Sequence, residues 1–213
     1  MFDGHNVFYD EDATYGKAWG LGDYLDTTEL PLMVVAVECS HRPPHERLDE
    51  YSPWSFSDAG FGDVEGKGDI TLRWMAETLK RRIDRRYPTL RDRENTFIAG
   101  SSMGGLMSLY ALLSRPDIYR GAAALSPSLW TAPEQLQALI RKAEIRPDSV
   151  LYMDYRGNEL ARDPRRRRSF GSVTSALIHR GMNLTSRIVP EGEHCEASWE
   201  RQIPFFLSTL LYQ

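Results

Sequence analysis

A run of small residues between two apolar segments constrains the fold of this chain more than any other feature. Residues 100–105 read Gly-Ser-Ser-Met-Gly-Gly, with an apolar run at 96–99 before them and a helical pattern at 106–113 after them. The sequence therefore predicts a strand, a tight turn and a helix. The turn has the G-x-S-x-G pattern, whose glycines let two backbones approach without a Cβ clash. It indicates Ser102 as a nucleophile on a strained turn. Ser101 is the alternative within the motif, but only Ser102 has glycine both two residues before it and two residues after it.

Strand-like and helix-like segments alternate along the rest of the chain. We expect strands at 32–37, 121–126, 150–153 and 184–189, and helices at 69–87, 133–142, 170–180 and 199–211. The run at 32–37 is continuously apolar, as in an interior parallel strand, whereas 40–68 has the scattered proline, glycine and charge of a long surface loop. This alternation predicts an α/β fold with a mostly parallel sheet, which binds ligands beyond the carboxyl ends of its strands.

Composition narrows the class of protein. At 213 residues the chain suits one core, so we expect a single domain over residues 1–213, and its net charge of −4 argues against a nucleic-acid partner. No apolar run approaches the ~20 residues of a membrane span, and the N-terminus lacks the features of a signal peptide. These observations predict a cytoplasmic protein with no membrane partner. Cys39 and Cys195 lie far apart and are expected to be free thiols rather than a bridge.

A serine hydroxyl becomes a nucleophile only when a base takes its proton, so Ser102 needs a histidine. On a strand–turn–helix site the acid and the histidine follow the serine, each on a loop after a later strand. Of the five histidines, only His194 follows the last expected strand. Three precede the serine and His179 lies within a helical pattern. His194 is therefore the expected base, against the alternative of a surface-loop histidine.

The acid should follow the strand at 150–153, where the candidates are Asp154, Glu159 and Asp163. Asp154 is close enough to the strand to be its last residue, so its side chain is more easily used in structure. Glu159 lies in the turn 157–159, which can bring a carboxylate toward the histidine. We therefore expect Glu159 to be the acid, with Asp154 as the main alternative and a solvated loop carboxylate as the alternative for either.

An ester-cleaving site also needs two backbone N–H groups for the oxyanion, one of them from the residue after the nucleophile. Met103 is that residue, and the early segment 3–5 is expected to supply the second amide from His5. Four aromatic residues are candidates for substrate contact, although packing is the commoner role of such residues: Trp19, Tyr51, Trp54 and Trp130. The arginine run 165–168 follows an Asp-Pro pair and predicts a solvated loop, with an anionic subsite as the alternative.

Several of these segments together resemble one family. They are residues 3–8, 50–54, 66–69, 99–106, 126–130, 156–159 and 192–194 with Trp199, and they cover nearly the whole chain. The chain resembles the putative-esterase family of α/β-hydrolases, which includes S-formylglutathione hydrolase, feruloyl esterase modules, siderophore esterases and mycolyltransferases. The resemblance implies a three-layer α/β-hydrolase sandwich. It also implies a triad of Ser102, Glu159 and His194, with oxyanion amides from His5 and Met103.

The activity that the resemblance implies is hydrolysis of a carboxylic ester through an acyl-enzyme, without a cofactor or metal. The substrate would be a small-molecule ester, such as an acylated sugar or an aryl ester, and homo-oligomerisation is left open. One departure separates this chain from the family. Family members carry two or three more strands before the segment matched by residues 3–8, including one beside the strand of the nucleophile. We therefore expect a copy shortened at its N-terminus, or a second chain that covers the gap.

This departure keeps other functions open. An acyltransferase would use the same residues and differ only in the acceptor. A catalytically impaired domain would keep the turn at residues 100–105 as part of the fold and act by binding an acylated sugar or a partner protein.

Overall fold

A parallel four-stranded sheet in the order β3-β4-β5-β6 forms the middle layer of the computed structural model, which describes residues 1–212. Its strands are β3 (Phe97–Ser101), β4 (Gly121–Leu125), β5 (Val150–Arg156) and β6 (Asn183–Val189). Every residue of β4 and β5 is buried. This is expected for β4 and for residues 150–153, which are continuous apolar runs covered on both faces, whereas Asp154 and Arg156, farther along β5, form an ion pair. A separate antiparallel hairpin is formed by β1 (Phe56–Asp58) and β2 (Gly62–Val64).

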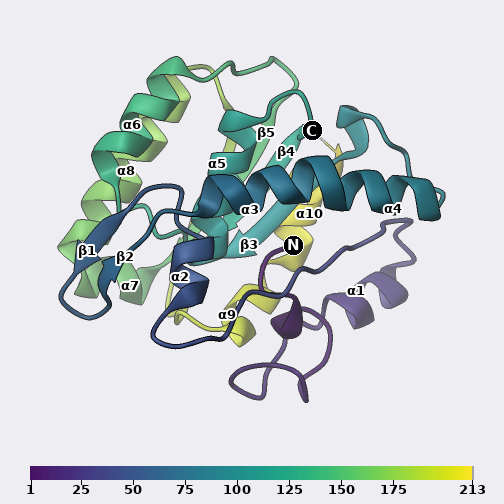
Figure 1. Ribbon diagram of the computed structural model, residues 1–213, viewed down its shortest axis with the longest axis horizontal. Helices are drawn as coiled ribbons and strands as arrows, with labels where there is room; N and C mark the ends of the chain where they lie inside the picture. Colours follow the sequence, from purple (N-terminus) through teal and green to yellow (C-terminus); the bar gives the residue numbers. More distant parts are fainter. Residues whose placement is uncertain (213) are drawn as a thin grey trace.

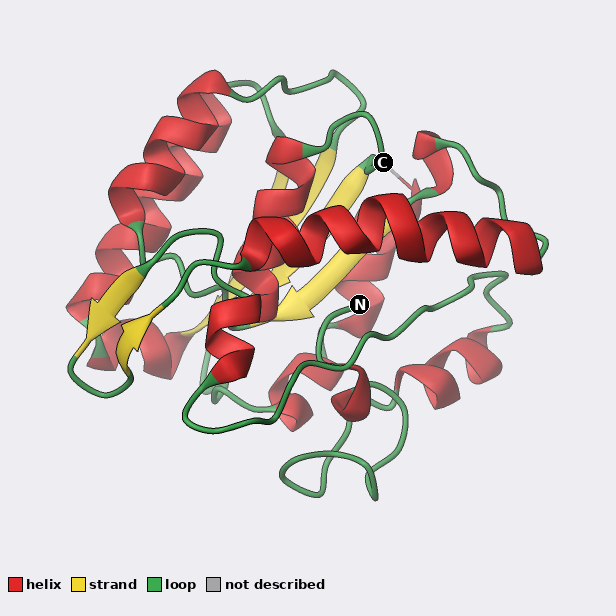
Figure 2. Ribbon diagram, in the orientation of Figure 1, coloured by secondary structure: helices red, strands yellow, loops and turns green. Residues whose placement is uncertain are grey.

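Helices cover both faces of the sheet (Figures 1 and 2). On one face α5 packs against β3 and β4 in a core shared with α3, α6 and α8, and α10 covers the other face. This arrangement confirms the predicted three-layer α/β fold. No helix within residues 1–212 has both the length and the apolar character that a membrane span requires. The α-helices are α1 (Leu21–Thr28), α2 (Glu46–Glu50), α3 (Gly68–Trp74), α4 (Lys80–Arg86), α5 (Met103–Ser114), α6 (Pro133–Lys142), α7 (Gly157–Arg162), α8 (Pro164–His179), α9 (Glu196–Glu200) and α10 (Ile203–Tyr212). Short 3₁₀ helices form η1 (Gly4–Asn6) and η3 (Arg93–Asn95), and the π-helical segment η2 (Met75–Leu79) joins α3 to α4.

Some predicted boundaries are wrong for local reasons. The expected loop 40–68 contains α2 and the hairpin, and the closing helix is divided into α9 and α10. The arginine run lies on α8 rather than in a loop. This helix begins with Pro164, which suits the first helical position, and the Asp163 side chain accepts a hydrogen bond from the Arg165 N–H as its N-cap. Both cysteines are free, as predicted.

The predicted interior strand at 32–37 is also wrong, because the segment has a neighbour at one end only. The Met1 amine donates to the Val35 carbonyl at 2.6 Å, and the Val37 N–H donates to the Met1 carbonyl at 2.9 Å. On the other side, the Phe2 N–H donates to the Ala99 carbonyl of β3 at 3.0 Å. A strand needs a partner along its length to form a ladder. Residues 32–37 therefore form no strand, and Met33 is 47% exposed.

An apolar groove of about 370 Å³ continues from Met1 between residues 31–35 and the edge of β3. It lies between the helical layers, with side chains from the η2–α4 region on one wall and from α10 on the other. Burial at the head of the groove removes water from the Met1 amine and lowers its pKa to about 5. The groove therefore occupies the level of the sheet beside β3. Its lining includes Leu79, Ile83, Phe97, Leu207 and Leu210.

Candidate functional site

Ser102 lies on the turn between β3 and α5, at the carboxyl edge of the sheet. Its backbone has φ 57° and ψ −119°, a left-handed conformation that is strained for a residue with a side chain. The neighbouring glycines make this turn possible. A Cβ on Gly100 would lie 2.7 Å from the carbonyl carbon of Gly104, and a Cβ on Gly104 would lie 2.8 Å from the Cβ of Phe2. The turn thus has the close backbone approach that the sequence predicts.

The loops after β5 and β6 bring a carboxylate and an imidazole together. Glu159 lies in the first turn of α7, directly after β5, and His194 follows β6. Nδ1 of His194 is 2.7 Å from Oε1 of Glu159, and the imidazole packs edge-on against Trp199 with ring centroids 5.0 Å apart. The predicted acid and the predicted base are therefore in hydrogen-bond contact.

The Glu159 carboxylate is held ionised although only 8% of the residue is exposed. Burial opposes its charge, but hydrogen bonds from His194 and Ser126 and the charge of Arg166 outweigh it and lower the pKa. Ser126 Oγ donates to Oε2 at 2.6 Å, and Arg166 donates to Oε1 at 2.6 Å. The carboxylate thus keeps its charge for His194.

Asp154, the main alternative, is used in structure. It lies within β5 rather than at its end, and its carboxylate accepts hydrogen bonds from the Tyr152 hydroxyl at 2.8 Å and the Ser126 N–H at 3.2 Å. Arg156 lies 3.1 Å away and is fully buried, like Asp154 itself. Burial raises the pKa of Asp154 despite this cation. No hydrogen bond or ion pair within residues 1–212 joins Asp154 to His194.

The two backbone amides predicted to be oxyanion donors, those of His5 and Met103, both lie in the first turn of a helical element. Met103 is the first residue of α5 and His5 is the second residue of η1, and amides in the first turn of a helix have no acceptor within that helix. Two side chains hold the segment of His5 in place. Arg47 binds the Asp3 carboxylate through two nitrogens at 2.6 and 2.8 Å, and the Tyr51 hydroxyl accepts a hydrogen bond from the Asp3 N–H at 3.1 Å.

The Ser102 hydroxyl has a serine neighbour. Its Oγ lies 3.5 Å from Oγ of Ser128, and the Ser128 N–H donates to the Ser102 carbonyl at 2.9 Å. Within residues 1–212 no hydrogen bond joins Ser102 to His194. In resting sites such a bond is often long and tightens only when the substrate binds.

The sequence assigns no role to Ser126, Ser128 or Arg166. The two serines belong to segment 126–130, which resembles the family, but the resemblance gives neither of them a function. Arg166 belongs to the arginine run 165–168, and no sequence pattern predicts its contact with Glu159.

The four aromatic candidates differ in position. Trp19 is 3% exposed and packs against Trp199 and Phe206 in the core, and Tyr51 is 1% exposed and supports Asp3. Both therefore have packing roles rather than surfaces for substrate contact. Two remain partly exposed: Trp54, which packs edge-on against Tyr110, and Trp130, over which the Arg165 and Arg166 guanidinium groups lie. Of the four, Trp130 is connected to the Glu159 region through Arg166.

Comparison with known proteins relates this site to a family. Residues 17–153 match the model of a family described as putative esterase. The uncharacterised protein YbbA of Bacillus subtilis (strain 168) is 28% identical over 135 residues, which are 62% of this chain and 51% of YbbA. The ferri-bacillibactin esterase BesA of the same organism is 40% identical over 69 residues, which are 32% of this chain and 23% of BesA. The chain thus spans about half the length of YbbA.

Solved structures share the fold. The enterochelin esterase of Shigella flexneri superposes with a TM-score of 0.71 at 19% identity, over 99% of this chain and 50% of that chain. The BES protein of Bacillus cereus gives a TM-score of 0.71 at 15% identity, over 100% of this chain and 81% of that chain. At these identities the likeness concerns the fold alone.

Proposed function

The chain belongs to the putative esterase family, and we propose that it is a serine carboxylic-ester hydrolase. The observation that carries this proposal is the Glu159–His194 pair, joined at 2.7 Å from the loops after β5 and β6. The strained Ser102 turn lies at the same carboxyl edge of the sheet, where α/β folds bind their ligands. The site therefore has a nucleophile candidate, a base and a carboxylate in the order that this chemistry uses.

In this mechanism Ser102 Oγ attacks the ester carbonyl while His194 takes its proton. The tetrahedral oxyanion is stabilised by the N–H groups of His5 and Met103, and His194 returns the proton to the leaving alcohol. Water then attacks the acyl-Ser102 bond with the same histidine as base, which releases the acid and the free serine. Glu159 keeps its charge throughout and stabilises the imidazolium that forms in both steps.

For the substrate we propose a small-molecule ester, such as an aryl ester or an acylated sugar. Trp130 and Trp54 are partly exposed aromatic surfaces, which suit stacking on an aryl group or a sugar. The chain is 40% identical to the ferri-bacillibactin esterase BesA over 69 residues, so we include siderophore esters among the candidate substrates. An acyltransferase would share every residue of this scheme and differ in the acceptor.

The test is hydrolysis of p-nitrophenyl acetate, with Ser101→Ala as the matched control for Ser102→Ala. The two serines are adjacent, and only Ser102 has the left-handed backbone. We expect Ser102→Ala to lower kcat by at least ~10⁴-fold and Ser101→Ala to stay within about threefold of the wild type. Equal rates for the wild type and Ser102→Ala would remove the proposal.

One observation favours a second candidate, a binding domain without turnover. The Ser102 hydroxyl neighbours Ser128, and no hydrogen bond to His194 is formed within residues 1–212. A fluorophosphonate probe distinguishes the two, because it labels only an activated serine. Labelling of the wild type but not of Ser102→Ala supports the hydrolase, whereas a folded wild-type protein that is not labelled supports the binding domain.

A further inference from the structure

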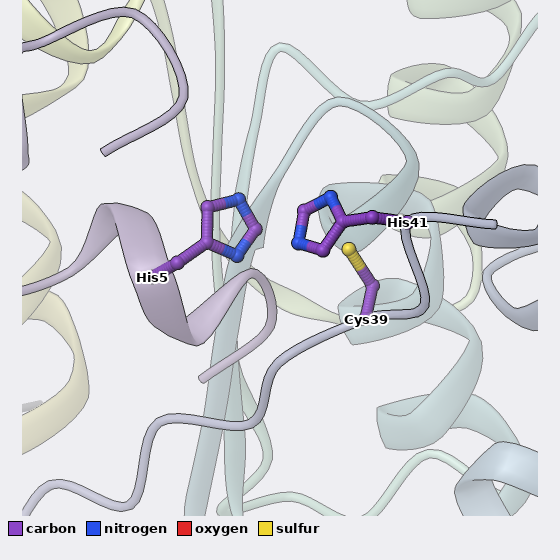
Figure 3. A group of neighbouring side chains, drawn as sticks. All are labelled: His5, Cys39 and His41. Carbon is purple, nitrogen blue, oxygen red and sulfur yellow. The ribbon is translucent and has the colours of Figure 1, made fainter. Parts of the chain in front are cut away.

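Three metal-binding side chains lie together beside the segment that carries the proposed oxyanion amide. His5 belongs to η1, and Cys39 and His41 belong to the irregular segment that follows residue 37. Each can offer one ligand atom, and these atoms all lie within 4.8 Å of one another. In Figure 3 the two imidazole rings and the thiol face one another. None of these three side chains has a role in the proposed hydrolysis.

The backbone holds these residues close together. The Gly4 N–H donates to the Val37 carbonyl at 2.8 Å, and a Cβ on Gly4 would lie 2.9 Å from the Glu38 nitrogen, so the two segments are in direct contact. The His5 and His41 rings meet edge to face with centroids 4.7 Å apart. The backbone contact at Gly4 therefore holds the segment of His5 next to the segment of Cys39 and His41, whatever rotamers their side chains adopt.

The state of each side chain suits a ligand. Nδ1 of His5 is buried and has no hydrogen-bond partner within residues 1–212, which is unfavourable by ~1–3 kcal/mol for a polar atom. Cys39 is buried and forms no disulfide, so its sulfur is available to bind a metal. His41 is exposed and His5 is half-buried, so an ion can reach the buried Cys39 from the His41 side of the cluster.

We propose that His5, Cys39 and His41 bind a divalent transition-metal ion, with Zn²⁺ as the best match. Zn²⁺ takes imidazole nitrogen and thiolate sulfur in tetrahedral sites, and three protein ligands leave its fourth position to water. Bond lengths of ~2.3 Å to sulfur and ~2.0–2.1 Å to nitrogen place tetrahedral ligands roughly 3.3–3.6 Å apart. The present span of up to 4.8 Å therefore has to contract. The Cys39 proton leaves to solvent as the thiolate–metal bond forms.

Contraction of the cluster would act on the ester site, because His5 belongs to both. Its imidazole is a metal ligand and its backbone N–H is the proposed oxyanion donor. Closing the cluster draws η1 toward Cys39 and moves that N–H. Loss of one oxyanion donor lowers turnover by ~10²–10³. We therefore expect Zn²⁺ to inhibit ester hydrolysis; this consequence rests on the proposed function, whereas metal binding does not.

Binding is tested on the full chain after treatment with a chelator. Calorimetry with Zn²⁺ should give one ion per chain, and Co²⁺ should give the charge-transfer absorption that only thiolate ligation produces. Cys39→Ala should abolish this absorption, and both Cys39→Ala and His41→Gln should weaken Zn²⁺ binding by roughly tenfold or more. Cys195→Ala and His179→Gln are matched controls outside the cluster and should bind like the wild type. His41 is exposed, so His41→Gln tests the site without disturbing the core. Wild-type affinity in both cluster variants would overturn the site.

The link between the two sites is tested by titrating p-nitrophenyl acetate hydrolysis with Zn²⁺. The inhibition constant should match the calorimetric Kd, and inhibition should weaken by the same factor in His41→Gln. Equal inhibition of the wild type and His41→Gln would overturn the link. If the metal-free protein has no esterase activity, the proposed function fails, while the Co²⁺ spectrum still decides the metal site.

Discussion

Replacing Glu159 by glutamine removes the charge of the proposed acid and leaves its geometry in place. Oε1 accepts hydrogen bonds from both His194 and Arg166, whereas Oε2 accepts one from the Ser126 hydroxyl. A glutamine amide oxygen at the position of Oε1 keeps both of these bonds. Its NH₂ then faces Ser126, whose hydroxyl can rotate to accept a hydrogen bond. The proton of His194 therefore stays on Nδ1, and only the electrostatic contribution of the carboxylate is lost.

The size of this loss follows from the charge separation. A carboxylate and an imidazolium whose charge centres are about 4 Å apart attract each other by about 4 kcal/mol at an effective dielectric constant of about 20. Part of this is recovered by the neutral hydrogen bond, so about 3–4 kcal/mol of transition-state stabilisation is lost, or ~10²–10³ in kcat/KM. Glu159→Ala also loses the orienting bond and should fall further, toward ~10⁴. Because the pKa of Glu159 is lowered, the carboxylate is ionised throughout a pH 5–9 assay, and the wild type should show no acidic limb from this group.

The assay is kcat/KM for p-nitrophenyl acetate, with Glu193→Gln as the matched control. Glu193 adjoins His194 but is exposed, and its side chain accepts hydrogen bonds from Asn158 and Arg162. It should stay within about threefold of the wild type, since exposed pairs contribute little. Equal kcat/KM for Glu159→Gln and Glu193→Gln would refute the reasoning. A large loss in Asp154→Asn without one in Glu159→Gln would assign the acid to Asp154.

Three further predictions concern the backbone and packing of the fold. Gly104→Ala should lower esterase activity, because its Cβ would lie 2.8 Å from the Cβ of Phe2. Gly171→Ala is the control: its Cβ would enter open space, so it should leave activity unchanged and raise the free energy of unfolding by about 0.5–1 kcal/mol. Equal effects of the two variants on activity would contradict the role of Gly104. Arg156→Met should lower the free energy of unfolding, measured by urea denaturation, by about 3–5 kcal/mol, because it leaves the Asp154 carboxylate buried and unpaired. The double variant with Asp154→Asn should recover part of this loss. A Val/Ile-rich segment of strand length fused before the first residue should fill the 370 Å³ groove, and each aliphatic side chain buried there contributes about 1.5–3 kcal/mol. Tm should therefore be higher than for a Gly/Ser fusion of equal length. Equal Tm values for the two fusions would refute the idea that the groove accepts a strand.

Most of the sheet could be predicted because its signals are local. Residues 121–125 and 150–153 are continuous apolar runs, and the turn at 100–105 carries its own glycine pattern. The segment 32–37 is also a continuous apolar run but forms no strand. Its strand would require a neighbour along its whole length, and residues 1–4 reach only one end. Apolar composition reports that a segment can be buried, not whether a partner is present.

The sequence alone determined the order of the candidate residues, Ser102 before Glu159 before His194, and the strained turn that holds the first of them. Their catalytic roles stay predictions. The tertiary structure decided which carboxylate contacts the histidine, because Asp154 is held by Tyr152 and Arg156 inside β5 while Glu159 lies in the first turn of the helix after it. The tertiary structure also placed Cys39 beside two histidines. Such pairings join segments far apart in the chain, and only the order of strands and the packing of loops fixes which of those segments meet.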